Sequence, residues 1–289
     1  MGPHRSCGDA RAQPGRAPEW LRDLAGAWVF YSVLPAWPGI APRFRRIARF
    51  APLIGVLLGA AQALLWLLSE AWLPGGARVA LVIALPLVLT GGLHHDGALD
   101  TADGLAAGPR ALAAMQDSRV GAAAVQTALL LALLRAAGLL CLAPLAAGIG
   151  ATALVWAGFW ARVAPLLAMH RYPYLRQAPA AGGSAGFHRR HWAGLGAELL
   201  PSLLVAVPLL AASAALGAAA AQPLPAAGVM ALAGAGLPPA LLLPWWLGRR
   251  LGGHSGDRYG ACGEWSETLA LLLSGLLGSL LPLAAAAAG

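Results

Sequence analysis

Long apolar stretches separated by short polar loops recur along this chain. Most of them reach or approach the ~20 residues that an α-helix needs to cross the hydrocarbon core of a bilayer. The pattern predicts about seven transmembrane helices, at 51–73, 77–93, 121–142, 146–169, 193–216, 227–247 and 268–287. A shorter apolar piece at 24–38 is interrupted by Pro35 and Pro38, so we expect a short interfacial or re-entrant helix there. The expected fold is all-α, a polytopic membrane helical bundle.

Composition supports this class and sets the domain organisation. Hydrophobic residues make up 58% of the 289-residue chain and charged residues only 11%, against about 25% charged in soluble domains. This excludes an ordinary soluble enzyme and a disordered protein. Residues 1–23 hold arginines among prolines and glycines and predict a disordered basic cytoplasmic tail, followed by one membrane-embedded catalytic domain at 24–289. The three cysteines are far apart and predict neither a disulfide nor a zinc site.

The arginines predict how the chain is oriented in the membrane. Seventeen of the 20 basic residues lie in the tail or in alternate loops, at 41–50, 94–120, 170–192 and 248–267, whereas the intervening loops hold none. Short arginine-rich loops stay in the cytoplasm. We therefore expect a multi-pass protein of the cell inner membrane, with the N-terminus and the active-site loops cytoplasmic. This scattered pattern explains the net charge of +8 better than a nucleic-acid site does, so no nucleic acid is expected as a partner.

Seven of the 12 acidic residues fall in two of the loops expected to be cytoplasmic. In the first, Asp96, Asp100 and Asp103 are spaced i, i+4, i+7, which places three carboxylates in one narrow stripe of a helix. Like charges so close need a positive partner, and Mg²⁺ prefers carboxylate, water and phosphate oxygens. We therefore expect these three aspartates to be metal ligands. The alternative is a solvated loop face.

The second acidic loop adds Asp257, Glu264 and Glu267, which share a face if the segment is helical. Two acidic faces would then close on one metal–phosphate cluster. His94, beside the first stripe, is open to several interpretations: a ligand, a general base, a phosphate contact, or a merely solvated side chain.

Individual charged side chains in and near the spans also suggest roles. Arg119, two residues after Asp117, is either a phosphate clamp or a topology anchor. Arg162 lies within an apolar run, where a charge needs a partner, so we expect it to face the bundle interior and pair with an acid or an anionic substrate. Arg135 is expected to snorkel or pair, and Glu198 to pair locally.

Three motifs together resemble those of the adenosylcobinamide-GDP ribazoletransferase family, also called cobalamin (5′-phosphate) synthases. They are TGGLHHDGALDTADG at 90–104, MQDSRVG at 115–121 and GGHSGDRYGACGEWSE at 252–267. Their order and spacing match over about residues 24–275. The polar segment at 171–187 is similar as well. Some positions depart from the pattern: His95 replaces an apolar residue, Ala98-Leu99 reverses the commoner order, and Val33 stands where an arginine is expected, which puts an anion contact from that segment in doubt.

The resemblance implies a membrane transferase that joins adenosylcobinamide-GDP to α-ribazole, or to its 5′-phosphate, with Mg²⁺ and releases GMP late in cobalamin biosynthesis. The ribazole hydroxyl would attack the cobinamide-linked phosphorus, and Asp96, Asp100 and Asp103 would hold the metal. The remaining candidate catalytic residues are His94, Asp117, Arg119, Arg162, Asp257, Glu264 and Glu267. Association with other enzymes of the same pathway is a possible further interaction.

Two alternatives remain at this stage. A CDP-alcohol phosphotransferase also sets aspartates at the cytoplasmic interface, but its pattern has an Ala-Arg pair soon after the first Asp-Gly, whereas Asp96-Gly97 is followed by Ala-Leu-Asp. A corrinoid or metal transporter would place ionisable groups near the membrane midplane. Here nearly all the acids lie at one face, and only Arg135 and Arg162 favour transport.

Overall fold

The computed structural model describes residues 17–175, 188, 190–219 and 225–288, and this part of the chain is helical with one isolated β-bridge, between Tyr174 and His254. The α-helices are α1 (Glu19–Tyr31), α2 (Ala51–Leu68), α3 (Gly75–Thr90), α4 (Leu93–Ala106), α5 (Ala111–Ala114), α6 (Ala122–Leu142), α7 (Ala147–Arg171), α9 (Leu195–Ala219), α10 (Ala226–Gly234), α11 (Leu237–Leu251) and α12 (Gly256–Ala288). Short 3₁₀ turns occur at Ala48–Phe50 and Gly108–Arg110. The all-α prediction is confirmed.

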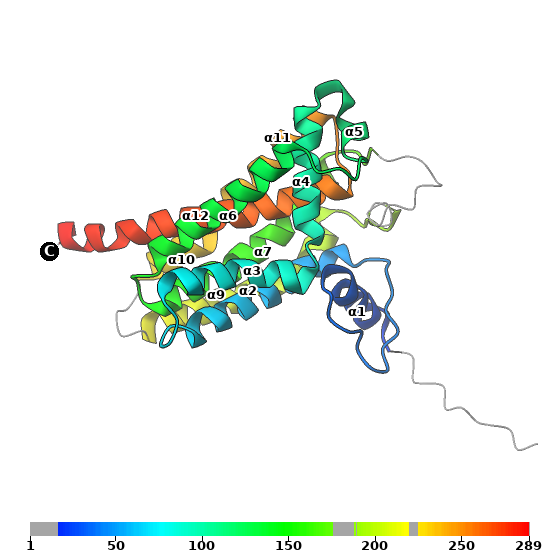
Figure 1. Cartoon of the computed structure of the whole chain (residues 1–289). Coiled ribbons are helices and arrows are strands. Elements are labelled where there is room, and N and C mark those ends of the chain that lie inside the picture. The colour runs from blue at the N-terminus through cyan, green and yellow to red at the C-terminus, as the bar shows by residue number, and fades with distance from the viewer. Residues whose placement is uncertain (1–16, 176–187, 189, 220–224, 289) are drawn as a thin grey trace, which may run out of the picture.

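Most of the predicted spans correspond to long apolar helices that form an elongated bundle (Figure 1). Within the described part of the chain, five are long and apolar enough to cross a membrane, namely Ala48–Leu68, Ala122–Leu142, Ala147–Arg171, Leu195–Ala218 and Ala226–Leu251. The pair α3 and α4 passes the same test together as a bent sixth. The predicted seventh span, 268–287, is the second half of α12. The expectation of about seven is thus close to the observed five or six.

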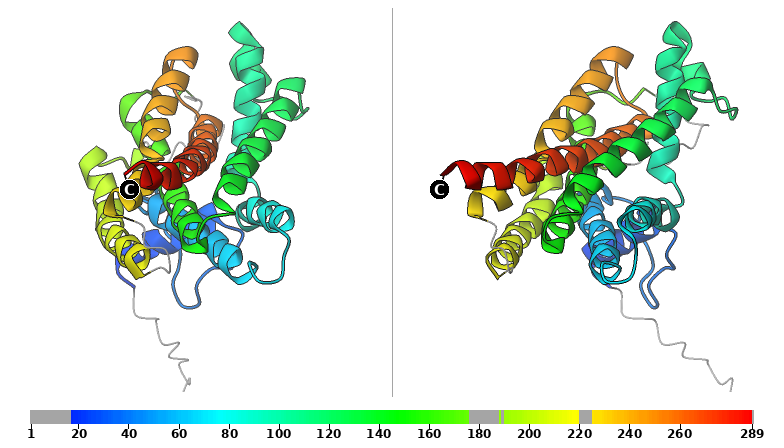
Figure 2. Two further views of the ribbon diagram at one scale, coloured as in Figure 1. Left: turned by 90° about the vertical axis from the view of Figure 1, so that its left-hand side faces the viewer. Right: turned by 60° about the vertical axis from the view of Figure 1, so that its left-hand side comes forward.

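The junction between α3 and α4 positions the first acidic motif. Gly91 and Gly92 have φ of 60° and 71°, a left-handed conformation that only glycine adopts at little cost. The chain bends by 95° at this point, and α4 runs across the end of the bundle in Figures 1 and 2. The aspartate stripe is therefore helical, as its spacing predicts, and it lies at one end of the bundle.

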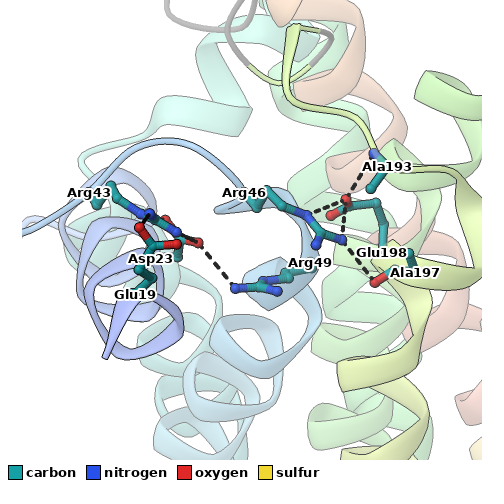
Figure 3. Close-up of polar contacts among 8 residues, drawn as sticks. All are labelled: Glu19, Asp23, Arg43, Arg46, Arg49, Ala193, Ala197 and Glu198. Carbon is teal, nitrogen blue, oxygen red and sulfur yellow. Dashed lines mark hydrogen bonds and ion pairs between the residues drawn. The ribbon is translucent and has the colours of Figure 1, made fainter. Parts of the chain in front are cut away.

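At the same end, α1 is attached to the bundle by ion pairs (Figure 3). Asp23 is fully buried and accepts hydrogen bonds from Arg43 at 2.7 Å and Arg49 at 3.1 Å. This pairing holds α1 against the bundle, and α1 begins at Glu19, inside the segment 1–23 that the sequence assigns to a tail; residues 1–16 lie outside the described part. Nearby, Arg46 donates to the buried Glu198 of α9 at 2.8 Å, a partner far away in sequence.

Small residues let the central helix α7 pack closely against α2. A side-chain carbon at Gly59 would lie 2.6 Å from the Leu154 carbonyl oxygen, so no larger residue fits without moving a backbone. Gly55 and Gly158 face each other in the same way. Such close approach of backbones is typical of helix packing in membranes. It fixes α7, which carries Arg162, in the middle of the bundle (Figure 1).

Candidate active site

A cavity of about 240 Å³ lies where α1, α4, α7 and α12 meet. It is smaller than the roughly 300–1,000 Å³ typical of pockets for drug-sized ligands, so it can enclose only part of a large substrate. Four of the candidate residues from the sequence line it, His94, Asp96, Arg162 and Asp257. Phe30, Tyr31 and His188, which the sequence did not single out, line it as well.

Glycines allow the two acidic helices to cross closely beside this cavity. A side-chain carbon at Gly97 of α4 would lie 2.9 Å from the Cα of Asp257, and one at Gly260 of α12 would lie 2.9 Å from the carbonyl oxygen of His94. Only hydrogen in place of Cβ permits these separations. The crossing therefore brings Asp96 and Asp257, which are 161 residues apart, to the same cavity.

Arg162 supplies a buried cation to the cavity. Its side chain is 3% exposed, and its Nε and Nη1 atoms have no hydrogen-bond partner within the described part of the protein. A side-chain carbon at Gly263 would lie 3.3 Å from Arg162 Nη1 and 3.6 Å from His94 Cδ2, so the guanidinium and the imidazole are neighbours. Buried guanidinium nitrogens without hydrogen-bond partners are costly unless an anion completes them. The expectation that Arg162 faces the interior is confirmed.

His94 lies at the start of α4 and is 6% exposed. Its Nδ1 atom has no hydrogen-bond partner among the described residues, and its ring stacks on Tyr31 with 5.8 Å between centroids. Burial raises the pKa of Tyr31 well above its usual value. The phenol therefore stays protonated near pH 7, while the imidazole is held in a fixed orientation with a ring nitrogen available.

An aromatic group from two separate segments also lines the cavity. His188 contacts Phe30 edge to face at 5.5 Å and stacks on Tyr31 at 6.5 Å. Burial lowers the pKa of His188 to about 3, so this imidazole is neutral near pH 7. The sequence indicated both segments through the resemblance, but adjacent aromatic residues alone carry no signal that separates a site from a core.

Glu264 and Glu267 lie behind the cavity and do not line it. Arg135 of α6 donates to Glu264 at 2.7 Å and lies 3.7 Å from Glu267, and all three side chains are nearly buried. His95 Nδ1 lies 3.6 Å from the same Glu264 oxygen. Arg135 thus pairs, as one of its two interpretations proposed, and the two glutamates form a charged support between α6 and α12.

The other acidic candidates lie outside the cavity lining. Asp103 accepts hydrogen bonds from the backbone amides of Gly121 at 2.7 Å and Ala124 at 3.0 Å, which satisfies the first turn of α6. Asp117 and Arg119 form an exposed ion pair at 2.6 Å, and the Arg119 hydrogen bonds lower the pKa of Asp117 to about 2. Asp100 is half-buried.

The arrangement fits a magnesium ion held partly by substrate, not one enclosed by protein. Among the residues described, no group of three or more His, Cys, Asp and Glu side chains could hold a metal ion. The three aspartates do not converge, because Asp103 is directed to the start of α6. Mg²⁺ commonly takes one or two carboxylates and completes its shell with water and phosphate oxygens. Asp96 and Asp257, which share the cavity, match that requirement.

Comparisons with known proteins identify the family of the chain. The family model described as cobalamin-5-phosphate synthase matches residues 23–275. A protein of Prochlorococcus marinus (strain MIT 9303), named adenosylcobinamide-GDP ribazoletransferase, is 55% identical over 91% of this chain and 98% of its own length. Proteins of the same name from Thermosynechococcus vestitus and Synechocystis sp. are 38% and 36% identical, each over 88% of this chain and 94% of its own length. No solved structure matches. With the family model covering most of its length, the chain belongs to the cobalamin-5-phosphate synthase family.

Proposed function

We propose that this chain is an adenosylcobinamide-GDP ribazoletransferase, and that it joins adenosylcobinamide-GDP to α-ribazole, or to its 5′-phosphate, at the cavity between α4, α7 and α12. The activity is the one that the closely similar relatives are named for. The observation that carries the assignment of the cavity is the buried Arg162 with two unpartnered nitrogens, beside His94 and facing the same space as two carboxylates. A diphosphate is an anion of matching charge and hydrogen-bonding capacity.

The proposed reaction is a single phosphoryl-group substitution. An oxygen of the ribazole hydroxyl forms a bond to the cobinamide-linked phosphorus, and the bond from that phosphorus to the bridging oxygen breaks. GMP departs with the bridging oxygen and the electron pair of the broken bond. The hydroxyl proton must pass to a base, and the Nδ1 atom of His94 is the proposed acceptor because it has no other partner among the described residues.

Arg162 is proposed to neutralise the diphosphate and the charge that the leaving GMP develops. In a buried site these interactions are stronger than in water, because the surroundings screen charge weakly. Asp96 and Asp257 would hold a Mg²⁺ ion, which supplies further neutralisation of the phosphate oxygens when bound. Tyr31, stacked on His94, would keep the imidazole oriented.

The cavity is proposed to face the cytoplasm of the cell inner membrane. It lies at the end of the bundle where the arginine-rich segments meet, including the 41–50 loop that pairs with α1 and α9 (Figure 3). Short basic loops stay on the cytoplasmic side. A labelling test with a membrane-impermeant maleimide on single cysteines placed at 118 and 144, in a variant without native cysteines, checks this orientation.

The direct test of the function is GMP release from adenosylcobinamide-GDP by membranes that contain this protein. We expect release only with α-ribazole or its phosphate and Mg²⁺ together, and a cobalamin product in equal amount. Asp96→Asn should lose most of this activity, while Arg119→Gln, on the exposed ion pair, should retain it. Absence of release by correctly inserted protein under all these conditions would contradict the proposal.

A further inference from the structure

The two ends of the cavity differ in chemistry. The polar end holds Arg162 and His94, which are neighbours across Gly263. The rings of Phe30, Tyr31 and His188 contact one another, and we call this group the aromatic end; Leu166 and Met169 of α7 also line the cavity. Tyr31 contacts both groups, because its ring stacks on His94 with 5.8 Å between centroids and on His188 with 6.5 Å. A ligand that fills this cavity therefore needs an anionic part joined to a flat apolar part.

The rings at the second end are arranged to hold a planar group. His188 and Tyr31 are nearly parallel, with an interplanar angle of 11°, and Phe30 meets His188 at 87°. Burial keeps His188 uncharged near pH 7, so the surface it presents is aromatic and not cationic. Aromatic side chains bind nucleobases by stacking on their faces, whatever the base.

Both substrates of the proposed reaction contain a base, and the composition of this end distinguishes between them. Guanine carries an amide and an exocyclic amine, which need hydrogen-bond partners when buried. The benzimidazole of ribazole is a bicyclic ring without exocyclic polar groups. None of the three aromatic residues carries a carboxylate or an amide that could pair with guanine, and Leu166 and Met169 add apolar surface to the cavity.

We propose that the aromatic end of the cavity, formed by Phe30, Tyr31 and His188, binds the base of the acceptor nucleoside and determines which bases are accepted. This inference rests on the proposed function and deepens it. It places the ribose hydroxyl between the base at Phe30 and the phosphate at Arg162, beside His94. The guanosine and the corrin ring of the donor extend out of the cavity, which is too small to enclose them.

The test compares Phe30→Ala with Phe50→Ala in steady-state kinetics with each substrate varied. Phe50 belongs to the same apolar cluster at the α1–α2 contact but does not line the cavity, so it controls for loss of packing. Removing one stacked aromatic group should weaken base binding by about 5- to 150-fold. We expect KM for α-ribazole to rise by that factor in Phe30→Ala, with KM for adenosylcobinamide-GDP changed less than about twofold. Phe30→Leu, which preserves more packing, should show the same direction.

A second readout concerns selectivity. Wild-type protein should prefer α-ribazole over an otherwise identical nucleoside that carries a purine, and Phe30→Ala should lose most of that preference. A purely structural defect would instead lower the rates with the two nucleosides by the same factor. A rise in the donor KM instead would assign this end to guanine and overturn the inference, as would an unchanged acceptor KM. Wild-type turnover in the same assay tests the proposed function separately, so the two failures are distinguishable.

Discussion

Replacing Arg162 with methionine tests the central electrostatic feature of the site. Methionine preserves an unbranched apolar stem but removes the guanidinium, whose Nε and Nη1 atoms have no partner among the described residues. Hydrogen bonds to charged groups contribute about 1.5–3 kcal/mol each, so two of them to a diphosphate contribute about 3–6 kcal/mol. Because each ~1.4 kcal/mol corresponds to a factor of ten, kcat/KM should fall by about 10²- to 10⁴-fold.

The assay is GMP release by purified protein in lipid nanodiscs, with a matched control. Arg78→Met removes another nearly buried arginine, which stacks on Trp66 at 3.8 Å at the end of α3 remote from α4. It should change stability but leave kcat/KM of the folded protein within about twofold. Arg162→Lys, which keeps the charge but loses the planar pair of donors, should recover only part of the activity.

Stability supplies the discriminating second measurement for Arg162→Met. Burial of two guanidinium nitrogens without hydrogen-bond partners costs free energy in the ligand-free protein, so the variant should unfold at a temperature no lower than the wild type. Loss of activity together with a clear loss of stability would indicate a structural role. Unchanged kcat/KM for Arg162→Met would refute the reasoning outright.

The remaining predictions concern groups around the cavity. Asp103→Asn weakens the hydrogen bonds to the first turn of α6, so it should lower the free energy of unfolding, measured by chemical denaturation, by about 0.5–2 kcal/mol. The Mg²⁺ concentration for half-maximal activity should stay unchanged. A large shift in that concentration would instead make Asp103 a metal ligand. Arg135→Met removes the cation that pairs with the buried Glu264 and Glu267, so it should destabilise the protein by about 3–5 kcal/mol. Adding Glu264→Gln should restore part of this stability. Equal stability of the single and double variants would contradict this prediction. Folding lowers the pKa of His188 from 6.5 to about 3, so between these pH values the unfolded chain binds more protons than the folded protein. The unfolding temperature should therefore fall as the pH drops from 6.5 to about 3, and it should fall less steeply in His188→Phe.

The sequence predicts the helices well because bilayer thickness imposes their length. Its apolar stretches correspond to α2, α3, α6, α7, α9, the pair α10 and α11, and the second half of α12. The prediction that Arg162 of α7 faces the bundle interior is also confirmed, because a single charge within an apolar run is costly when it faces lipid. The aspartate spacing correctly indicates a helix, α4.

What sequence spacing does not give is the partner of each charged side chain. The i, i+4, i+7 spacing does not indicate that Asp103 accepts hydrogen bonds from the backbone amides of Gly121 and Ala124, because only the tertiary fold brings these groups together. In the same way, the face of α12 that carries Glu264 and Glu267 pairs with Arg135, more than 120 residues earlier. Long-range pairing of this kind depends on helix crossings, which the periodicity of one helix cannot specify.

The most direct test of the account is an experimental structure of the protein in a nanodisc with adenosylcobinamide-GDP, without acceptor and with Ca²⁺ in place of Mg²⁺. The account predicts the diphosphate within hydrogen-bond distance of the Arg162 guanidinium, with the metal ion between it and Asp96 or Asp257. It also predicts that the space beside Phe30 and His188 remains open for the acceptor base. A diphosphate bound at the exposed Arg119 loop, or guanine inserted beside Phe30, would contradict it.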